Sequence, residues 1–451
     1  MNRLIRIRKG FDVPIAGEPE QVVYPGAPVR NVALCGVDHV GLRPRLLVSV
    51  GDAVGLGQPL WEDKRDPAVC YPSPGRGVVT AVNRGTRRVL ESVVVSLQDS
   101  GARDLQFEAL TTHEIEQLDR DAVAERMLRS GLWTALRTRP FSRVPQSGST
   151  PDSIFVTAID TRPLAPDPKV VIARDAEHFA LGLQVLTRLT EGRVWLCTAP
   201  DWSITLPGIE RVTRVSFTGP HPAGLPGTHI HMLHPVSAKR SVWHLAMQET
   251  VSIGRLITTG RLWTERVIAL SGPMVSRPRM IRTRLGASLN DLLAAELEPG
   301  KCRVVSGSVL DGHRATTWAA YLGRFSRQVT VLPEGEPRRF LGWLMPGMDR
   351  YSAVPSFGGA LKSSRFPLST TMNGSARAMV PIGNFESILP LDMLPAPLLK
   401  ALIVGDTDMA QKLGCLELDQ EDLALCSFVC PSKYDYGAYL RDSLNKIEKE
   451  G

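Results

Sequence analysis

Short strand-forming runs separated by glycine turns fill residues 46–97, and this pattern limits that part of the chain to a small β-barrel or sandwich. Apolar and polar residues alternate around a tight turn at Gly51, and a second break follows at Gly57. Two more strands are expected over 72–82 and 92–97, with a turn between them. Strands this short bury an apolar face only by packing against one another.

The phrase V-x-x-G-D-x-V-x-x-G-Q-x-L, which begins at Val48, resembles the barrel of biotinyl and lipoyl carriers. The modified lysine of a carrier lies at a hairpin tip, usually between methionines. Lys64 is the candidate for that position, and no methionine flanks it. We therefore expect an interaction module, with a carrier that is modified at Lys64 as an alternative.

A different pattern follows the barrel. This is expected, because a chain of 451 residues exceeds the roughly 250–300 residues at which a single hydrophobic core stops growing, so several domains are needed. Buried strands are expected over 152–160, 169–173 and 193–197, with a helix over 176–190. A strand, a helix and a strand in that order predict a parallel, Rossmann-like sheet. Neither G-x-G-x-x-G nor a P-loop occurs in the sequence, so this layer has no recognisable nucleotide site.

The remaining sequence indicates two further units. A helix expected over 289–297, opened by a capping box at Ser288, lies among short strands, which is typical of a ubiquitin-like β-grasp domain. The tail ends in a helix with Leu440, Leu444 and Ile447 on one face. We expect a multidomain α+β and α/β fold with four parts: an N-terminal segment with the barrel (1–100), the Rossmann-like domain (101–260), the β-grasp domain (261–335) and a helical domain (336–451).

The C-terminal region contains half of an iron–sulfur motif. Cys426 and Cys430 match the closing C-x3-C-P of the ferredoxin run, but Gln420 and Leu423 occupy the positions of its two earlier cysteines. A four-iron cluster takes four thiolates, so this pair cannot hold one alone. The alternatives are a scaffold that has lost its cluster ligands and two unpaired cysteines in a helical region.

Composition excludes several classes of protein. No run is long and apolar enough for a membrane helix, and the basic residues 3–9 lead into Asp12 and Pro14 rather than a signal peptide. Seven scattered cysteines fit a reducing cytoplasm. The net charge of +7 gathers in segments 3–9, 137–143 and 277–284, which suits an acidic partner, anionic lipid or solvated surface. We do not expect nucleic acid, because no recognition signature accompanies the arginines.

Two segments could bind a ligand. His229 and His231 would share one face of a strand, but no Asp or Glu lies between residues 211 and 248, so we expect a structural or ligand-gating loop rather than a metal site. The segment 130–143 is aromatic, basic and rich in turns, and suits a flat ligand with polar ends, such as a quinone. An ordinary loop after a helix is the alternative. No catalytic triad or carboxylate pair stands out.

Several phrases, taken together and in order, resemble the A subunit of the sodium-translocating NADH:quinone oxidoreductase. They are Lys9-Gly-Phe-Asp-Val-Pro-Ile-Ala-Gly17, Ser130-Gly-Leu-Trp-Thr-Ala-Leu-Arg-Thr-Arg-Pro-Phe-Ser-Arg-Val-Pro145, Gly219-Pro-His-Pro-Ala-Gly224, Met379-Val-Pro-Ile-Gly-Asn384 and Cys426-Ser-Phe-Val-Cys-Pro-Ser-Lys-Tyr434. That family is similar to the C subunit of Rnf complexes and to the NADH-binding flavoprotein subunit of respiratory complex I.

The resemblance implies a subunit that binds no flavin, NADH or iron–sulfur cluster of its own. The relatives carry a glycine-rich flavin loop where this chain has Trp133, Leu136 and Arg137, whose side chains would block a phosphate from the backbone. The cofactors are then expected on the other subunits of the complex (B to F). The family's complex lies in the bacterial inner membrane, passes electrons from NADH to ubiquinone and pumps sodium outward. Its A subunit is peripheral, on the cytoplasmic face, and meets the membrane through its partners.

The same resemblance suggests where ubiquinone, the substrate, would be bound. We expect contacts in two segments, formed by Trp133, Arg137, Arg139 and Phe141 and by Leu34, Cys35, Gly36 and His39. No catalytic residue and no metal ligand is predicted. The competing expectation is an assembly subunit that braces the complex without touching quinone.

Overall fold

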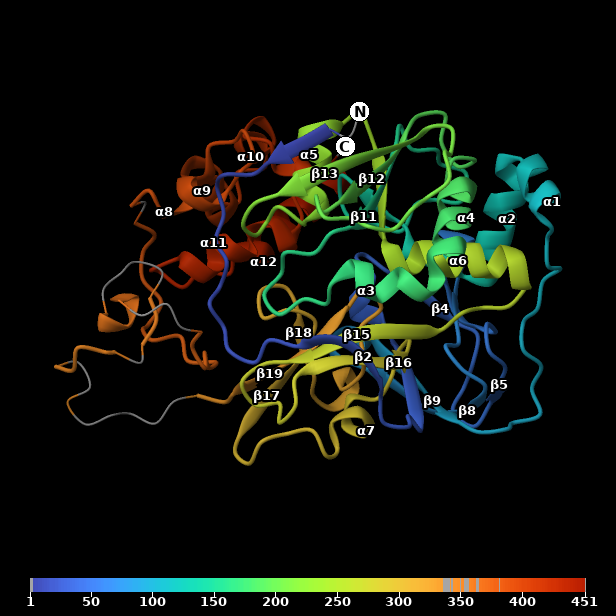
Figure 1. The fold of residues 1–451 in the computed structure, drawn as a ribbon, viewed down its shortest axis with the longest axis horizontal. Helices are drawn as coiled ribbons and strands as arrows, with labels where there is room; N and C mark the ends of the chain where they lie inside the picture. Colours follow the sequence, from blue (N-terminus) through green and yellow to red (C-terminus); the bar gives the residue numbers. More distant parts are fainter. Residues whose placement is uncertain are drawn as a thin grey trace.

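The computed structural model arranges the chain as a barrel, two larger sheets with their helices, and a C-terminal group of helices that packs beside the first of these sheets (Figure 1). The structure describes residues 3–335, 341, 344–348, 350–352, 357–361, 365–380 and 382–450. The start of the predicted helical domain, 336–340, and residue 381 of the phrase 379–384 lie outside the described residues.

The barrel is built from two small antiparallel sheets, as the glycine turns predict. One has the order β3-β9-β8-β5 and the other β4-β6-β7. Their strands are β3 (Asn31–Cys35), β4 (Pro44–Leu46), β5 (Ala53–Val54), β6 (Pro59–Asp63), β7 (Asp66–Pro72), β8 (Gly77–Arg84) and β9 (Leu90–Leu97). Gly51 and Gly57 have φ of 99° and 84°, values that glycine adopts without strain. Lys64 lies exposed in the β6–β7 turn, at a hairpin tip as the carrier resemblance suggested.

The second unit is a six-stranded sheet with the order β1-β13-β12-β11-β14-β10. All of its neighbouring strands are parallel except the edge strand β10, which runs antiparallel to β14. The strands are β1 (Arg3–Arg6), β10 (Arg137–Arg139), β11 (Ile154–Ala158), β12 (Val194–Thr198), β13 (Val212–Thr218) and β14 (Val242–Ala246). The predicted parallel, Rossmann-like layer is therefore present, and its first strand comes from the N-terminus.

Helices α4 (Ala176–Leu186) and α6 (Met247–Thr259) of this unit pack closely because glycine lies at their contact. A Cβ atom on Gly182 would lie 2.0 Å from the Thr250 carbonyl oxygen, and one on Gly254 would lie 1.9 Å from that of His178. The other helices of this part are α1 (Thr112–Gln117), α2 (Arg120–Ser130), α3 (Pro168–Ile172) and α5 (Pro226–Leu233).

Two predicted segments of this unit are wrong. The strand expected over 169–173 is the helix α3, because Asp167 caps it and Pro168 occupies its first turn, and these start signals outweigh the β-branched residues that follow. The loop expected around His229 and His231 is the helix α5, which also begins at a proline.

The third unit is a mixed sheet with the order β18-β17-β19-β15-β16-β2, covered by one short helix. Strands β15 and β19 are parallel while their outer neighbours are antiparallel, the pairing expected of a β-grasp core. Helix α7 is capped by Ser288 as predicted but ends at Leu293, earlier than expected. The elements are β2 (Glu20–Pro25), β15 (Glu265–Ser271), β16 (Arg279–Arg284), α7 (Leu289–Leu293), β17 (Cys302–Ser306), β18 (His313–Arg314) and β19 (Gln328–Pro333).

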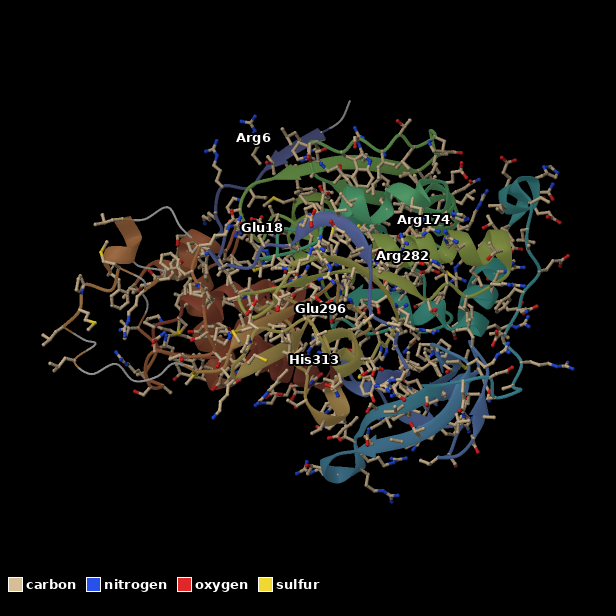
Figure 2. The ribbon with its side chains drawn as sticks, turned by 60° about the horizontal axis from the view of Figure 1, so that its bottom comes forward. Arg6, Glu18, Arg174, Arg282, Glu296 and His313 are labelled. Atoms are coloured by element: carbon tan, nitrogen blue, oxygen red, sulfur yellow. The ribbon has the colours of Figure 1, made fainter. Side chains whose placement is uncertain are left out.

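Three of the four arginines of segment 277–284 form ion pairs within the molecule, and Arg284 donates to the Pro74 carbonyl. Arg279 contacts Glu296 at 2.7 Å, and Arg282 contacts Glu265 at 3.1 Å. Glu265 also lies 4.0 Å from Arg174 of the preceding unit, so this contact links that unit to the mixed sheet; Arg174 and Arg282 are labelled in Figure 2. Most of this positive run is therefore matched by carboxylates of the same chain.

The C-terminal region is helical, as predicted, and has an apolar core that includes Leu440, Leu444 and Ile447 of the last helix. Its helices are α8 (Asn384–Ile388), α9 (Pro395–Val404), α10 (Thr407–Lys412), α11 (Ala424–Val429) and α12 (Tyr436–Glu450), with a short turn of helix, η8, at Gln420–Leu423. In the part of the chain that the structure describes, no helix is both long enough and apolar enough to cross a membrane.

Candidate functional site

A cavity of about 430 Å³ opens where the three larger units and the barrel meet. Its floor is the carboxyl end of the parallel sheet, at Ala246 of β14 and at Asp160, which follows β11. Parallel α/β sheets bind ligands at this edge, because the loops that leave the strands diverge there. The mixed sheet contributes the segments 306–313 and 325–328, and the C-terminal region contributes residues around η8.

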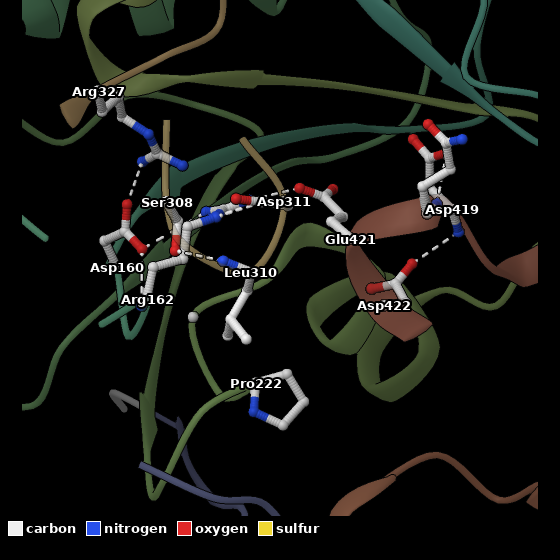
Figure 3. Close-up of polar contacts among 12 residues, drawn as sticks. Asp160, Arg162, Pro222, Ser308, Leu310, Asp311, Arg327, Asp419, Glu421 and Asp422 are labelled. Carbon is white, nitrogen blue, oxygen red and sulfur yellow. Dashed lines mark hydrogen bonds and ion pairs between the residues drawn. The ribbon is translucent and has the colours of Figure 1, made fainter. Parts of the chain in front are cut away.

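One wall of the cavity is a network of charged side chains, most of which are shielded from solvent. Arg162 contacts Asp160 at 3.4 Å and Asp311 at 2.6 Å, and it also pairs with Glu421 (Figure 3). Arg327 lies 3.4 Å from Asp160 on the other side. Burial alone would raise the pKa of Asp160, but the guanidinium groups of Arg327 and Arg162 outweigh it and lower the pKa.

Arg139, one of the predicted quinone residues, is held by the C-terminal region. Its side chain is fully buried, donates to Asp422 at 2.8 Å and to Glu421 at 3.0 Å, and lies 3.8 Å from Asp419. Asp419 also pairs with Arg441 of α12. Arg139 therefore supports the cavity wall from behind, and its charge is already matched.

The opposite wall joins the two segments in which quinone contacts were predicted. The turn of helix η1 (Gly36–Asp38) lines the cavity, and so does Arg137 of β10. The Arg137 guanidinium lies 4.6 Å from the centroid of the Phe325 ring. His39 is buried behind them, with its ring 4.6 Å from that of Tyr71, and burial together with the nearby arginines lowers its pKa to about 3, so the ring is neutral.

The other predicted quinone residues lie away from the open space. Trp133 is fully buried, donates from Nε1 to the Pro145 carbonyl at 2.8 Å and packs edge-on against Trp243. Phe141 packs against the C-terminal core. The remaining three are structural parts of β3 and its end: Leu34 and Cys35 are buried, and a Cβ on Gly36 would lie 2.2 Å from the Leu90 carbonyl oxygen. Arg137 is thus the one predicted residue that lines the cavity.

The histidines of α5 have protein partners. His231 contacts Glu417 at 2.8 Å through Nδ1 and accepts the Asp392 N–H at 3.0 Å through Nε2. His229 is buried, and its Nε2 lies 3.0 Å from the Ala223 carbonyl oxygen. Among the residues described, no group of three or more His, Cys, Asp or Glu side chains is arranged to hold a metal ion.

Both cysteines of the partial iron–sulfur motif are buried in the C-terminal core. Cys430 Sγ lies 3.2 Å from the hydroxyl of Tyr436, and burial raises the pKa of Cys426 to about 12. The Cys426 thiol is therefore protonated at neutral pH, and both side chains are packed among apolar neighbours.

The charged residues of this cavity wall were not predicted from the sequence. Asp160 and Arg162 had a recognisable signal, because they directly follow a predicted buried strand, where α/β proteins place functional groups. Asp311, Glu421 and Arg327 had none, since each lies in a loop or turn without a motif and reaches the cavity only through the packing of separate units.

Comparisons with known proteins identify the units. The family model described as the NqrA N-terminal barrel-sandwich hybrid domain matches residues 5–98, and the NqrA second alpha/beta domain matches 118–262. The model described as the NQRA C-terminal domain matches 267–317. A solved NAD+-reducing [NiFe]-hydrogenase in the H2-reduced state matches 48% of this chain and 47% of that chain, at 16% identity and a TM-score of 0.37, a likeness too weak to support an argument.

Full-length relatives share about half of the residues. The A subunit of the Na(+)-translocating NADH-quinone reductase of Pseudomonas aeruginosa (strain UCBPP-PA14) is 54% identical over 449 residues, which are 99% of this chain and 100% of that protein. The proteins of the same name from Serratia proteamaculans (strain 568) and Yersinia pestis are 52% and 51% identical over the same shares. The predicted resemblance is confirmed, and this chain belongs to the NqrA family, the A subunits of the Na(+)-translocating NADH-quinone reductase.

Proposed function

We propose that this chain is a peripheral subunit on the cytoplasmic face of the bacterial inner membrane, in the complex that transfers electrons from NADH to ubiquinone and exports Na+. Within that complex it takes part in the reduction of ubisemiquinone to ubiquinol. One observation carries the proposal: two segments that are far apart in sequence, 34–39 and 133–141, meet at the same cavity. The family to which the chain belongs supplies the reaction.

The cavity offers what a quinone ring needs. The ring is flat and apolar with two carbonyl acceptors, so it requires N–H donors at its ends and apolar side chains over its faces. Arg137 lines the cavity and supplies N–H donors. Val40, Leu245 and Leu310 supply apolar surface, and the Phe325 ring lies beside Arg137.

An assembly role without quinone contact is the second candidate, and the burial of Trp133 and Arg139 favours it. Both side chains are fully buried in contacts within the chain, so these residues of the segment act on the fold. In that case the cavity would be a by-product of packed domains. We infer that other subunits of the complex carry the flavins, iron–sulfur centre and NADH site and connect this chain to the membrane.

A photoreactive ubiquinone analogue, used on the complete complex, separates the two candidates. We expect label in residues 34–42 or 133–142 and competition by unlabelled ubiquinone. Arg137→Ala should raise the KM for ubiquinone about tenfold or more, because a hydrogen bond from a charged donor contributes about 1.5–3 kcal/mol.

Arg129→Ala is the matched control, since Arg129 lies on α2 in an exposed pair with Glu125 and outside the cavity. Co-purification of the other subunits must be intact in both variants. Label confined to other subunits, together with an unchanged KM in Arg137→Ala, would contradict a quinone role and favour the assembly candidate.

A further inference from the structure

We infer that an exposed apolar knob between β19 and α8 is the surface by which this chain docks on another subunit of the complex, one with an apolar face rimmed by carboxylates. The knob consists of five side chains from two short segments: Leu341, Leu344, Met345, Met348 and Leu361. This inference rests on the proposed function, in which the chain is a peripheral subunit, and adds to it the surface that holds the chain in place.

The side chains of the knob are exposed although they are large and apolar. Leu344 is 63% exposed and Leu361 is 87% exposed. In the part of the chain that the structure describes, 17 large apolar side chains are exposed, and eight of them, including all five of the knob, lie between residues 341 and 382. Single exposed apolar residues are ordinary on a soluble protein, but a cluster of them marks an interaction site.

Backbone hydrogen bonds join the two segments into one surface. The Gly358 N–H donates to the Pro346 carbonyl at 2.7 Å. The Gly359 N–H donates to the Gly347 carbonyl at 3.0 Å. The leucines and methionines of the two segments are therefore presented together, at one end of the molecule beyond the mixed sheet and away from the barrel (orange in Figure 1).

An aromatic cluster anchors the knob on the body of the molecule. The Tyr351 ring centroid lies 5.6 Å from that of Phe366, 6.1 Å from that of Phe11 and 6.4 Å from that of Phe428. Phe11 belongs to the N-terminal segment and Phe428 to α11, so separate parts of the chain support the base of the knob. A surface that is already in place loses little conformational freedom when a partner binds, which favours a stable complex.

The charge of this region indicates that the partner carries carboxylates. Between residues 338 and 382 the sequence has five arginines and one lysine but a single acidic residue, Asp349. The Arg350 guanidinium lies 5.9 Å from the centroid of the Phe357 ring, close in sequence to the methionines of the knob. Methionine, arginine and aromatic residues are enriched at protein interfaces, whereas lysine and acidic residues are depleted there.

A protein fits this surface better than a lipid bilayer does. In the described part of 341–382 the helical structure is limited to the four-residue turn η6 (Gly358–Leu361), and the backbone is otherwise irregular. Irregular backbone does not enter the hydrocarbon of a membrane, because its N–H and C=O groups would lack hydrogen-bond partners. The face of another protein supplies such partners around an apolar centre.

The test measures how tightly the full chain binds to the complex from which this subunit has been removed. We expect the double variant Leu344→Asp with Leu361→Asp to bind about 100-fold more weakly or worse, because two unpaired charges would be buried in the interface. Val50→Asp with Val89→Asp is the matched control, since these valines are 62% and 63% exposed on turns of the barrel. The control should bind like the wild type, and both double variants should keep the wild-type unfolding temperature.

A photocrosslinking amino acid, p-benzoylphenylalanine, placed at Leu344 in the complete complex identifies the partner. We expect an adduct with another subunit. Adducts confined to lipid or to a second copy of this chain would overturn the inference, and so would binding to phosphatidylglycerol vesicles as tight as binding to the complex.

The failure of this inference can be distinguished from the failure of the proposed function. A knob variant that binds the complex like the wild type would overturn the inference alone. A wild-type chain that does not co-purify with the other subunits would overturn the proposed function as well.

Discussion

At the scale of single residues, the fully buried Arg139 holds the C-terminal region against the parallel sheet. Its guanidinium faces the carboxylates of Asp422, Glu421 and Asp419. Asp419 and Glu421 keep Arg441 and Arg162 when Arg139 is lost, but the buried carboxylate of Asp422 then has no cationic partner among the described residues. Arg139→Met should therefore lower the free energy of unfolding by about 3–5 kcal/mol, measured by chemical denaturation of the full chain.

The exposed pair of Arg129 and Glu125 gives the comparison for that prediction. Arg129→Ala should change the free energy of unfolding by less than about 0.5 kcal/mol, because solvent screens an exposed ion pair. Equal effects of the two substitutions would show that Arg139 does not hold the domains together.

At the scale of elements, the β6–β7 hairpin places Lys64 where carriers place their modified lysine. Hydrogen bonds hold the tip of this hairpin against the barrel, however. Arg65 donates to Asp63 at 2.8 Å and to the Gly41 carbonyl at 2.9 Å, and the Lys64 backbone N–H donates to the Arg43 carbonyl at 2.8 Å. A modifying enzyme needs a tip that stands free, so we expect intact mass spectrometry of the purified chain to give the unmodified mass. An added lipoyl or biotinyl mass that disappears in Lys64→Arg would contradict this and revive the carrier alternative.

Elements with strong local signals were predictable, and two helices that begin at a proline were not. The parallel strand order around α4 and the last helix α12 follow from apolar periodicity. The segment 169–173 misled because its valines favour a strand, whereas Asp167 and Pro168 start a helix. Helix α5 was obscured by neighbouring prolines and glycines, which suggested a loop.

At the scale of the whole molecule, the cavity depends on contacts that cross between units, and a sequence carries little signal for these. Strands β1 and β2 of the N-terminal segment join the parallel and the mixed sheet respectively, so the first residues connect the two. The resemblance to a family indicated which segments matter, 34–39 and 133–141. It did not indicate that most of their side chains are buried and that Arg137 faces the open space.

The same contacts make the docking of the C-terminal helices sensitive to acid. Burial opposes ionisation of Asp419, but Arg139 and Arg441 outweigh it and hold its pKa well below the ordinary value, and Arg162 and its neighbours likewise lower the pKa of Glu421. Groups with a lowered pKa stabilise the folded state above the unfolded value near pH 4, and this stabilisation is lost as the pH falls further. Asp422 differs, since burial raises its pKa to about 6, so its protonation begins first and costs no stability.

We therefore expect hydrogen exchange in residues 413–450 to rise as the pH drops from about 5 to about 3, after correction for the intrinsic rate, and before the barrel core exchanges. Asp419→Asn should show the raised exchange at neutral pH already, because the substitution removes the charge that Arg139 and Arg441 bind. Asp442→Asn on the exposed side of α12 should behave like the wild type. Uniform protection of this region down to about pH 3 would mean that apolar packing, rather than charge, holds the C-terminal helices in place.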